Sequence, residues 1–469
     1  MKKYNLVSLS EIDNLSQAEV VKYYKEYINP GIATFLRILG LDSYKIIKAE
    51  GMYLYSECGR KILDFSGGMS VLNHGHNHPR ILEARRRFNE NKHLEICKAF
   101  ISQYQSVLAR NLAEIFPGDL NYSFFCNSGA EANEGALKMA LLYHFPNRDK
   151  VIYTDLGYHG KTFGTMSVSG PASRPYSELF KRIEGCIEVP YGDIDAFRGL
   201  VEKRISAGKN DIAAVILESI KADSVVVPPK GYLRELSLLC RKYGIILILD
   251  EVFTGFGRTG KMFAFEHESV IPDIVTFSKS LGGGKASIAG YIAKSHIFKK
   301  TYGPLNRSTV HTTTFGGMGE ECFTAIEALN IINDEDLVEN SREQGRYLLL
   351  RLESLRKKYP RYIKEARGIG LLCVCELYKS SEVFSARMLK NAPQIEGLLL
   401  GLLPAVIVSE MFKKYNVLIY TGGREDNLFI NPSLIVKKEE IDNFIEALDK
   451  VMSENLVQLS IGLATNLFK

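Results

Sequence analysis

Six short apolar runs between residues 122 and 293 constrain the fold more than any other feature of the sequence. They are Tyr122–Cys126, Val151–Asp155, Ala213–Glu218, Ile245–Asp250, Asp273–Ser278 and Ala289–Ala293. Runs without polar alternation are typical of strands buried on both faces, as in a mainly parallel sheet. Helical patterns separate them, including Ala130–His144 and Tyr232–Tyr243, and Gly244 offers a C-terminal stop for the second. The sequence therefore predicts an α/β fold with helices on both faces of the sheet.

The flanking regions predict a second, smaller α+β domain. Ahead of the sheet, the patterns indicate a helix and two strands, at Gln17–Tyr27, Gly51–Tyr55 and Lys61–Phe65. After Asp334 they indicate a helix, three strands and a helix, at Leu337–Lys358, Gly370–Leu377, Val417–Tyr420, Leu428–Ile430 and Lys438–Glu454. We expect residues 1–75 to join the small domain, residues 76–333 to form the large domain and residues 334–469 to complete the small one.

Composition disfavours several classes of protein. The 469 residues include 59 basic and 54 acidic side chains, so the formal charge of +5 is mild and predicts no nucleic-acid partner. The eight cysteines are scattered without a metal-type CxxC pair, which favours reduced thiols and predicts no metal site. No apolar stretch follows the basic start of the chain before Glu11, so we expect no secretory signal and a cytoplasmic location.

One segment, Gly397–Val408 (GLLLGLLPAVIV), is nearly all apolar. It is well short of the roughly 20 residues that span a bilayer. We therefore expect a core helix or an interface segment rather than a membrane span.

Two small-residue turns follow predicted strands at the edge where ligands gather in open α/β sheets. Asn127-Ser128-Gly129-Ala130-Glu131 opens a helix, and its free backbone N–H groups would suit a phosphate, although such a turn is often only a helix cap. Gly157-Tyr158-His159-Gly160 holds an aromatic side chain between glycines. That ring could stack on a flat cofactor or simply pack in its loop.

Asp250 and Lys279 follow two other predicted strands. A buried carboxylate is costly unless it is paired with a cation, and a protonated pyridine nitrogen would be such a partner. Alternatively, Asp250 could cap a helix or belong to a structural ion pair. Lys279 precedes a turn of three glycines, where burial would lower its pKa and allow a Schiff base, although most lysines are solvated surface groups. A lysine, a carboxylate and a phosphate cradle are what pyridoxal 5′-phosphate (PLP) chemistry needs.

Several long motifs strengthen this reading. They are GHNHP at Gly75–Pro79, NSGAEANEGALKMA from Asn127, YHGKT from Tyr158, DEVFTGFGRTGKMFA from Asp250, PDIVTFSKSLGGG from Pro272 and TTFGG from Thr313. In these motifs the chain resembles the class III aminotransferases of PLP fold type I, from about residue 50 to residue 434. That group contains the ornithine, acetylornithine, 4-aminobutyrate and putrescine aminotransferases and glutamate-semialdehyde aminomutase.

The resemblance implies a role for each matching residue. Lys279 would hold PLP covalently and move the proton between the substrate Cα and C4′, and Asp250 would pair with the pyridinium nitrogen. Val252 and Tyr158 would cover the two ring faces, and Lys279, Asp250 and Tyr158 would be the catalytic residues. The expected cofactor contacts are Ser128, Gly129, Ala130, Tyr158, His159, Glu218, Asp250, Val252, Lys279 and Thr314. Thr314 would reach the cofactor phosphate of the neighbouring subunit, so the resemblance implies a homodimer.

Departures from the family pattern concern the substrate. Phe253 replaces a glutamine that bonds the phenolic oxygen of PLP, and Asp223 shortens the gating glutamate. Phe429 stands where members that use 2-oxoglutarate or glutamate carry an arginine, and phenylalanine cannot bind a carboxylate. Lys221 or Arg424 could bind a carboxylate instead. The hypothesis is an apolar pocket for an amine or aldehyde on a long carbon skeleton, which the apolar insertion described above could help to cover.

The expected reaction is a ping-pong transamination between an amine donor and an aldehyde or keto acceptor. Two alternatives remain at this level. A PLP aminomutase would move the amino group within one molecule. A catalytically silent scaffold would keep the fold without the cofactor, which the presence of Lys279, Asp250 and Thr314 disfavours.

Overall fold

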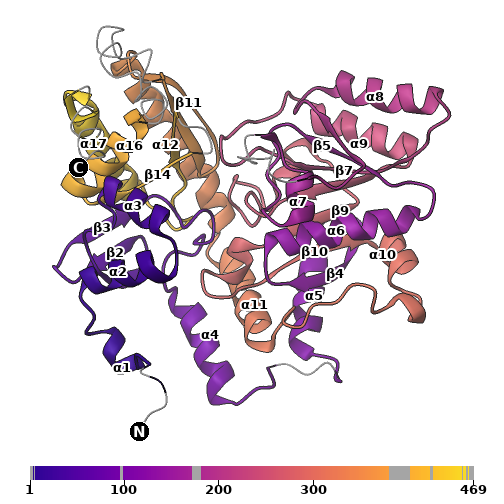
Figure 1. Ribbon diagram of the computed structural model, residues 1–469, viewed down its shortest axis with the longest axis horizontal. Coiled ribbons are helices and arrows are strands. Elements are labelled where there is room, and N and C mark those ends of the chain that lie inside the picture. The colour runs from indigo at the N-terminus through magenta and orange to yellow at the C-terminus, as the bar shows by residue number, and fades with distance from the viewer. Residues whose placement is uncertain are drawn as a thin grey trace.

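Two lobes make up the molecule, as Figure 1 shows. The computed structural model describes residues 4, 6–95, 99–171, 181–379, 402–422, 426–456, 458–460 and 463. Elements from the middle of the chain form the lobe on the right of Figure 1, and elements near both ends form the lobe on the left.

A seven-stranded sheet forms the centre of the larger lobe. Its strands, in spatial order, are β4 (Leu120–Cys126), β10 (Ala289–Lys294), β9 (Ile274–Phe277), β8 (Ile246–Asp250), β7 (Ile212–Glu218), β5 (Lys150–Thr154) and β6 (Cys186–Val189). Within this sheet only β10 runs antiparallel to its neighbours, so the prediction of a mainly parallel sheet is confirmed. Strand β6 was not predicted, because this short edge strand is only partly buried and lacks a continuous apolar run.

Alternate residues of the central strands enter two separate cores. In β8, Ile246 and Ile248 pack with α6 (Gly129–His144), whereas Leu247 and Leu249 belong to the core that contains α9 (Tyr232–Tyr243). Burying one such side chain contributes about 1.5–3 kcal/mol, so both faces must be covered. The other helices of this lobe are α4 (Pro79–Glu90), α5 (Gln103–Ile115), α7 (Phe163–Ser167), α8 (Ile194–Ser206), α10 (Ser295–Thr301) and α11 (Gly319–Asp334).

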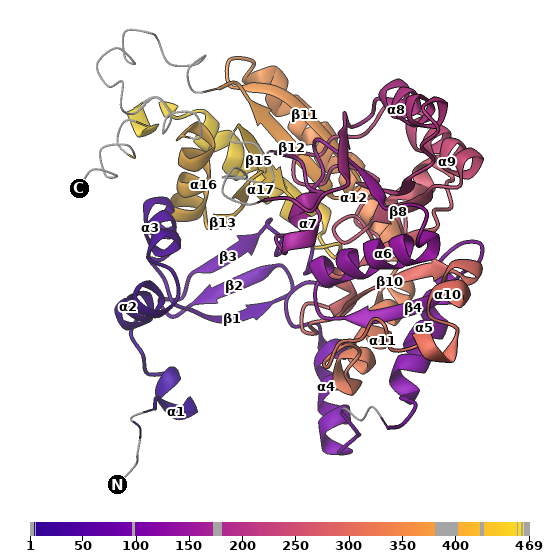
Figure 2. The ribbon, with the colours of Figure 1, turned by 45° about the vertical axis from the view of Figure 1, so that its right-hand side comes forward.

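The smaller lobe joins segments from both ends of the chain, as Figure 2 shows. Strand β13 (Val417–Leu418) pairs in parallel with β3 (Lys61–Asp64), in a sheet completed by β2 (Tyr53–Ser56) and β1 (Ile46–Glu50). A second sheet has the order β11 (Ile363–Ile369), β12 (Leu372–Leu377), β15 (Asn427–Ile430) and β14 (Tyr420–Thr421). The helices of the smaller lobe are α1 (Leu9–Ile12), α2 (Gln17–Tyr27), α3 (Pro30–Leu39), α12 (Leu337–Lys358), α16 (Leu402–Tyr415) and α17 (Lys438–Met452). The predicted fold class is thus confirmed, whereas the residue boundaries of the domains stay a prediction.

The described part of the apolar insertion packs inside the protein. Leu403, Val406 and Ile407 of α16 are buried in the main hydrophobic core. This is the core-helix alternative, and residues 397–401 lie outside the described residues. Within the described ranges, no helix is both long and apolar enough to cross a membrane.

Candidate active site

The site lies at the edge of the sheet where β5, β7, β8 and β9 end. Asp250 and Glu218 are the last residues of their strands, Lys279 follows β9 by two residues, and Tyr158 and His159 lie on the turn after β5. A cavity of about 560 Å³ opens here. Its lining comprises Met69, Gly129, Ala130, Asn133, Tyr158, His159, Gly160, Lys161, Glu218, Lys221, Ala222, Asp223, Asp250, Val252, Phe253, Lys279, Thr421 and Gly422.

Eight of the ten predicted cofactor residues line this cavity. The other two lie outside the lining. Ser128 caps the N-terminus of α6 and is exposed, and Thr314 is exposed on the loop before α11. The smaller lobe contributes Met69, Thr421 and Gly422, which the sequence analysis did not identify. No local sequence pattern indicates these three residues, because the packing of the two lobes brings them to the sheet edge.

Hydrogen bonds fix the Asp250 carboxylate in its buried position. His159 Nδ1 and Asn133 Nδ2 each lie 2.8 Å from Oδ2, and the Val252 N–H donates to Oδ1 at 2.9 Å. Thr276 orients Asn133 by donating to its Oδ1 at 2.7 Å. Burial alone would raise the pKa of Asp250, but these contacts outweigh it, so the pKa lies below its usual value. The group is therefore an ionised carboxylate, which matches a protonated ring nitrogen.

Lys279 combines a strained backbone with a desolvated amine. Its φ of +48° is in the left-handed region, which is costly for a residue with a side chain and is often found at functional sites. Burial lowers the pKa of Lys279 to about 8, although the negative charge of Asp250 partly opposes this shift. The Nζ atom lies 3.8 Å from the centre of the Phe253 ring. A neutral amine, able to attack an aldehyde, is therefore accessible near neutral pH.

This pKa predicts how the apoenzyme captures PLP. Because only the neutral amine reacts, the second-order capture rate should rise about tenfold per pH unit below pH 8 and level off above it. The absorbance of added PLP measures this rate, with Nα-acetyl-lysine as a control whose pKa is near the ordinary value of about 10.4. A rate for the protein that is still rising between about pH 9 and pH 10 would contradict the lowered pKa.

Small residues shape a cradle for a phosphate at the start of α6. A Cβ atom added to Gly129 would lie 2.7 Å from Val252 Cγ1, and one added to Gly160 would lie 2.7 Å from Ala130 Cβ. Within the described ranges, nothing accepts a hydrogen bond from the backbone N–H of Gly129 or Ala130. Free N–H groups and the helix dipole favour an anion at this position. Together with Lys279 and ionised Asp250, this cradle fits PLP.

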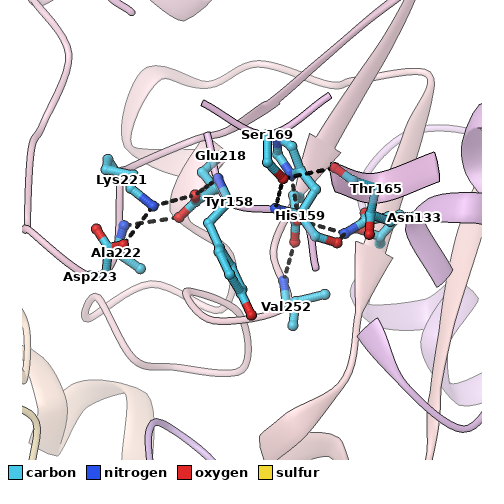
Figure 3. Close-up of polar contacts among 12 residues, drawn as sticks. Asn133, Tyr158, His159, Thr165, Ser169, Glu218, Lys221, Ala222, Asp223 and Val252 are labelled. Carbon is cyan, nitrogen blue, oxygen red and sulfur yellow. Dashed lines mark hydrogen bonds and ion pairs between the residues drawn. The ribbon is translucent and has the colours of Figure 1, made fainter. Parts of the chain in front are cut away.

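Glu218, Lys221 and Asp223 form a cluster at one side of the cavity (Figure 3). Lys221 Nζ lies 3.1 Å from Glu218 Oε1 and 3.0 Å from Asp223 Oδ2. Glu218 also accepts hydrogen bonds from the backbone N–H groups of Tyr158, at 2.9 Å, and Ala222, at 3.0 Å. Burial alone would lower the pKa of Lys221, but the two carboxylates raise it, so this lysine stays protonated.

Phe253 and Phe429 occupy different positions relative to the cavity. Phe253 lines it, whereas Phe429 is fully buried in a hydrophobic cluster and lies outside the lining. Their ring centroids are 5.8 Å apart at 70°, so Phe429 packs edge-to-face against Phe253. The other predicted carboxylate binder, Arg424, lies outside the described residues.

Comparisons with known proteins place the chain in a family. Residues 41–452 match the sequence profile described as "Aminotransferase class-III". A solved (S)-enantioselective omega-transaminase from Thermomicrobium roseum is 30% identical with a TM-score of 0.79, and the alignment covers 94% of this chain and 98% of that one. Ornithine aminotransferase from Toxoplasma gondii is 27% identical with a TM-score of 0.79, covering 96% and 98%. Taurine:2-oxoglutarate aminotransferase from Bifidobacterium kashiwanohense, solved with PLP and glutamate, is 27% identical with a TM-score of 0.78, covering 96% and 99%.

These similarities confirm the predicted family, enzyme class and cofactor, and with them PLP fold type I. The profile alone extends over most of the chain. The protein therefore belongs to the class III aminotransferases, which are PLP-dependent enzymes.

Proposed function

We propose that this aminotransferase moves an amino group between an amine donor and an aldehyde or keto acceptor by a ping-pong mechanism, and that its substrate is apolar or an omega-amine. The observation that carries the proposal is the pair of phenylalanines. Phe253 lines the cavity and Phe429 packs behind it. The family resemblance implies a glutamine at the first position, and an arginine at the second in members that use 2-oxoglutarate or glutamate. Lys221 offers no free charge in exchange, since two carboxylates already pair with it. The similarity to an omega-transaminase supports the same substrate class.

The residues that follow the strands at the sheet edge would each have a separate role in the reaction. PLP, when bound, supplies the electron sink that stabilises a carbanion at the substrate Cα. Lys279 holds the cofactor and moves the proton at Cα, a function typically worth about 10² to 10⁴-fold in rate. Asp250 keeps the ring nitrogen protonated, and His159 and Asn133 hold this carboxylate in place. Tyr158 and Val252 cover the ring faces.

We also propose that the active unit is a homodimer. Thr314 is exposed and lies outside the cavity lining of its own chain. The adjacent Phe315 is 58% exposed, so an apolar side chain beside Thr314 is available to pack against a second subunit. In that arrangement Thr314 would bind the phosphate in the neighbouring site.

Substitutions at the two phenylalanines test the proposed pocket. Phe429→Arg alone should destabilise the protein by about 3–5 kcal/mol, because the guanidinium would be buried in an apolar cluster. Phe253→Gln together with Phe429→Arg would open a polar route to the cavity. We expect the double variant to increase kcat/KM for 2-oxoglutarate relative to hexanal by about tenfold, the effect of one charge-assisted contact.

Thermal unfolding and acceptor kinetics measure these two effects, and Phe253→Gln alone is the matched control. The proposal predicts that the wild-type enzyme prefers hexanal. A wild-type enzyme that uses 2-oxoglutarate as efficiently as hexanal would contradict the apolar pocket.

A further inference from the structure

We infer that Asp223 is the receptor for a second, positively charged group at the far end of the amine donor. The preferred donors would then be diamines, or amines with another distal cation, rather than simple monoamines or amino acids. This inference rests on the proposed transamination and specifies its donor class.

The charges of the Glu218–Lys221–Asp223 cluster do not cancel. Two carboxylates surround one ammonium group, at 3.1 Å and 3.0 Å, so the cluster carries one net negative charge. Glu218 is the more completely satisfied acid, because both of its oxygens also accept backbone N–H groups. The unbalanced negative charge of the cluster is therefore on Asp223, where a bound cation could neutralise it.

Exposure selects the same residue. The side chains of Lys221 and Glu218 are only 5% and 8% exposed, whereas that of Asp223 is 31% exposed and lines the cavity. Lys221 contacts Asp223 at Oδ2. This contact orients the carboxylate and leaves it able to accept a further hydrogen bond. A carboxylate fixed in this way, partly shielded from water, is well suited to bind an ammonium group.

The reacting amine lies within electrostatic range of this cluster. The charges of Glu218, Lys221 and Asp223 all act on the pKa of Lys279, the group that the donor must approach. Phe253 and Met69 line the same cavity and offer apolar contacts for a methylene chain. A donor could therefore place one nitrogen near Lys279 and a second near Asp223.

An anionic distal group would fit poorly at the same position. Lys221 is already paired with Glu218 and Asp223, so an incoming carboxylate could reach only its remaining N–H donor and would face the net negative charge of the cluster. Lys161 also lines the cavity, but it is exposed and follows Gly160, which lies against Ala130 at the phosphate cradle. The cluster thus selects against the distal carboxylate of a dicarboxylate or an omega-amino acid.

Donors of equal length test the inference on the PLP-loaded enzyme. The single-turnover rate of the cofactor absorbance change would be compared for 1,5-diaminopentane, pentylamine and 5-aminopentanoate. We expect the diamine to exceed both others in apparent kcat/KM by about tenfold or more, as one charge-assisted hydrogen bond would give. A wild-type enzyme without this preference, or one that prefers 5-aminopentanoate, would overturn the inference without any variant.

Variants identify the residue responsible. Asp223→Asn should lower the diamine-to-monoamine ratio about tenfold, whereas Asp223→Glu should retain most of it. Asp195→Asn removes an equal charge from an exposed position on α8 and should leave the ratio unchanged. An unchanged ratio in Asp223→Asn, or an equal loss with both donors, would assign Asp223 a structural role and overturn the inference.

A binding measurement separates recognition from chemistry. The pyridoxamine form of the enzyme does not react with amines, so calorimetry would report only the affinity for 1,5-diaminopentane and pentylamine. The diamine should bind about tenfold more tightly to the wild-type protein and lose this advantage in Asp223→Asn. The spectrum of the PLP-loaded wild-type enzyme separates the two proposals. If no amine altered that spectrum, the proposed transamination itself would be contradicted. If diamine and monoamine altered it equally, only the role of Asp223 would be contradicted.

Discussion

Replacement of Lys279 with alanine will lower the turnover of amine donors by at least about 10²-fold and will abolish covalent attachment of the cofactor. Lys279 follows β9 at the sheet edge, and its lowered pKa of about 8 makes it suited both to bond an aldehyde and to accept a proton. The absorbance spectrum of the holoenzyme and the rate of its change with amine measure both effects.

Lys285→Ala is the matched control for this variant. Lys285 is exposed six residues further along the same glycine-rich turn, and its replacement should leave the spectrum and the rate as in wild type. If Lys279→Ala still showed the absorbance of a covalently bound cofactor, Lys221, which is buried and lines the same cavity, would be the anchor.

The same variant tests the proposed dimer. In a mixture of Lys279→Ala and Thr314→Ala subunits, one site of each hybrid dimer would combine an intact Lys279 with the intact Thr314 of the other chain. We expect the mixture to be more active than either variant alone. Mixing that restores no activity would contradict a Thr314 that acts across a subunit interface.

Replacement of Asp250 with asparagine should lower turnover by about 10² to 10³-fold, the cost of removing a preorganised charge from a site sheltered from water. The reason is electrostatic. The pKa of Asp250 lies below its usual value, so the native group is a carboxylate that can stabilise a protonated ring nitrogen. Asparagine preserves the shape but not the charge, and its one amide oxygen cannot replace both Oδ2, which His159 and Asn133 contact, and Oδ1, which accepts from the Val252 N–H.

Single-turnover kinetics at saturating cofactor would measure this loss, with cofactor affinity determined separately by titration. Asp273→Asn offers a comparison, because Asp273 pairs with Lys294 at the opposite edge of the same sheet. The turnover rate of Asp273→Asn should lie within a few-fold of the wild-type rate, even if the variant is less stable. An Asp250→Asn enzyme with the wild-type rate would exclude Asp250 as the partner of the ring nitrogen.

The sequence by itself determined the large sheet and the residues that follow its strands. Buried strands need continuous apolar runs, and this local requirement identified six of the seven strands and placed Asp250 and Lys279 at the ligand-binding edge. The family motifs then indicated the cofactor. Strands β1, β6 and β11 went unpredicted, because most of their residues are exposed or partly exposed and their patterns lack a buried run.

Only the tertiary structure decided which of these residues share a surface and which charges remain free. The sequence presented Lys221 as a possible carboxylate binder, but in the fold two carboxylates pair with it. It presented Phe429 as part of the pocket, but Phe429 lies behind Phe253 in a closed hydrophobic cluster. The contact between Phe253 and Phe429 joins residues that are distant in the chain. The partners of Lys221 are close to it in sequence, but their burial beside the cavity depends on the whole fold, so local periodicity encodes neither arrangement.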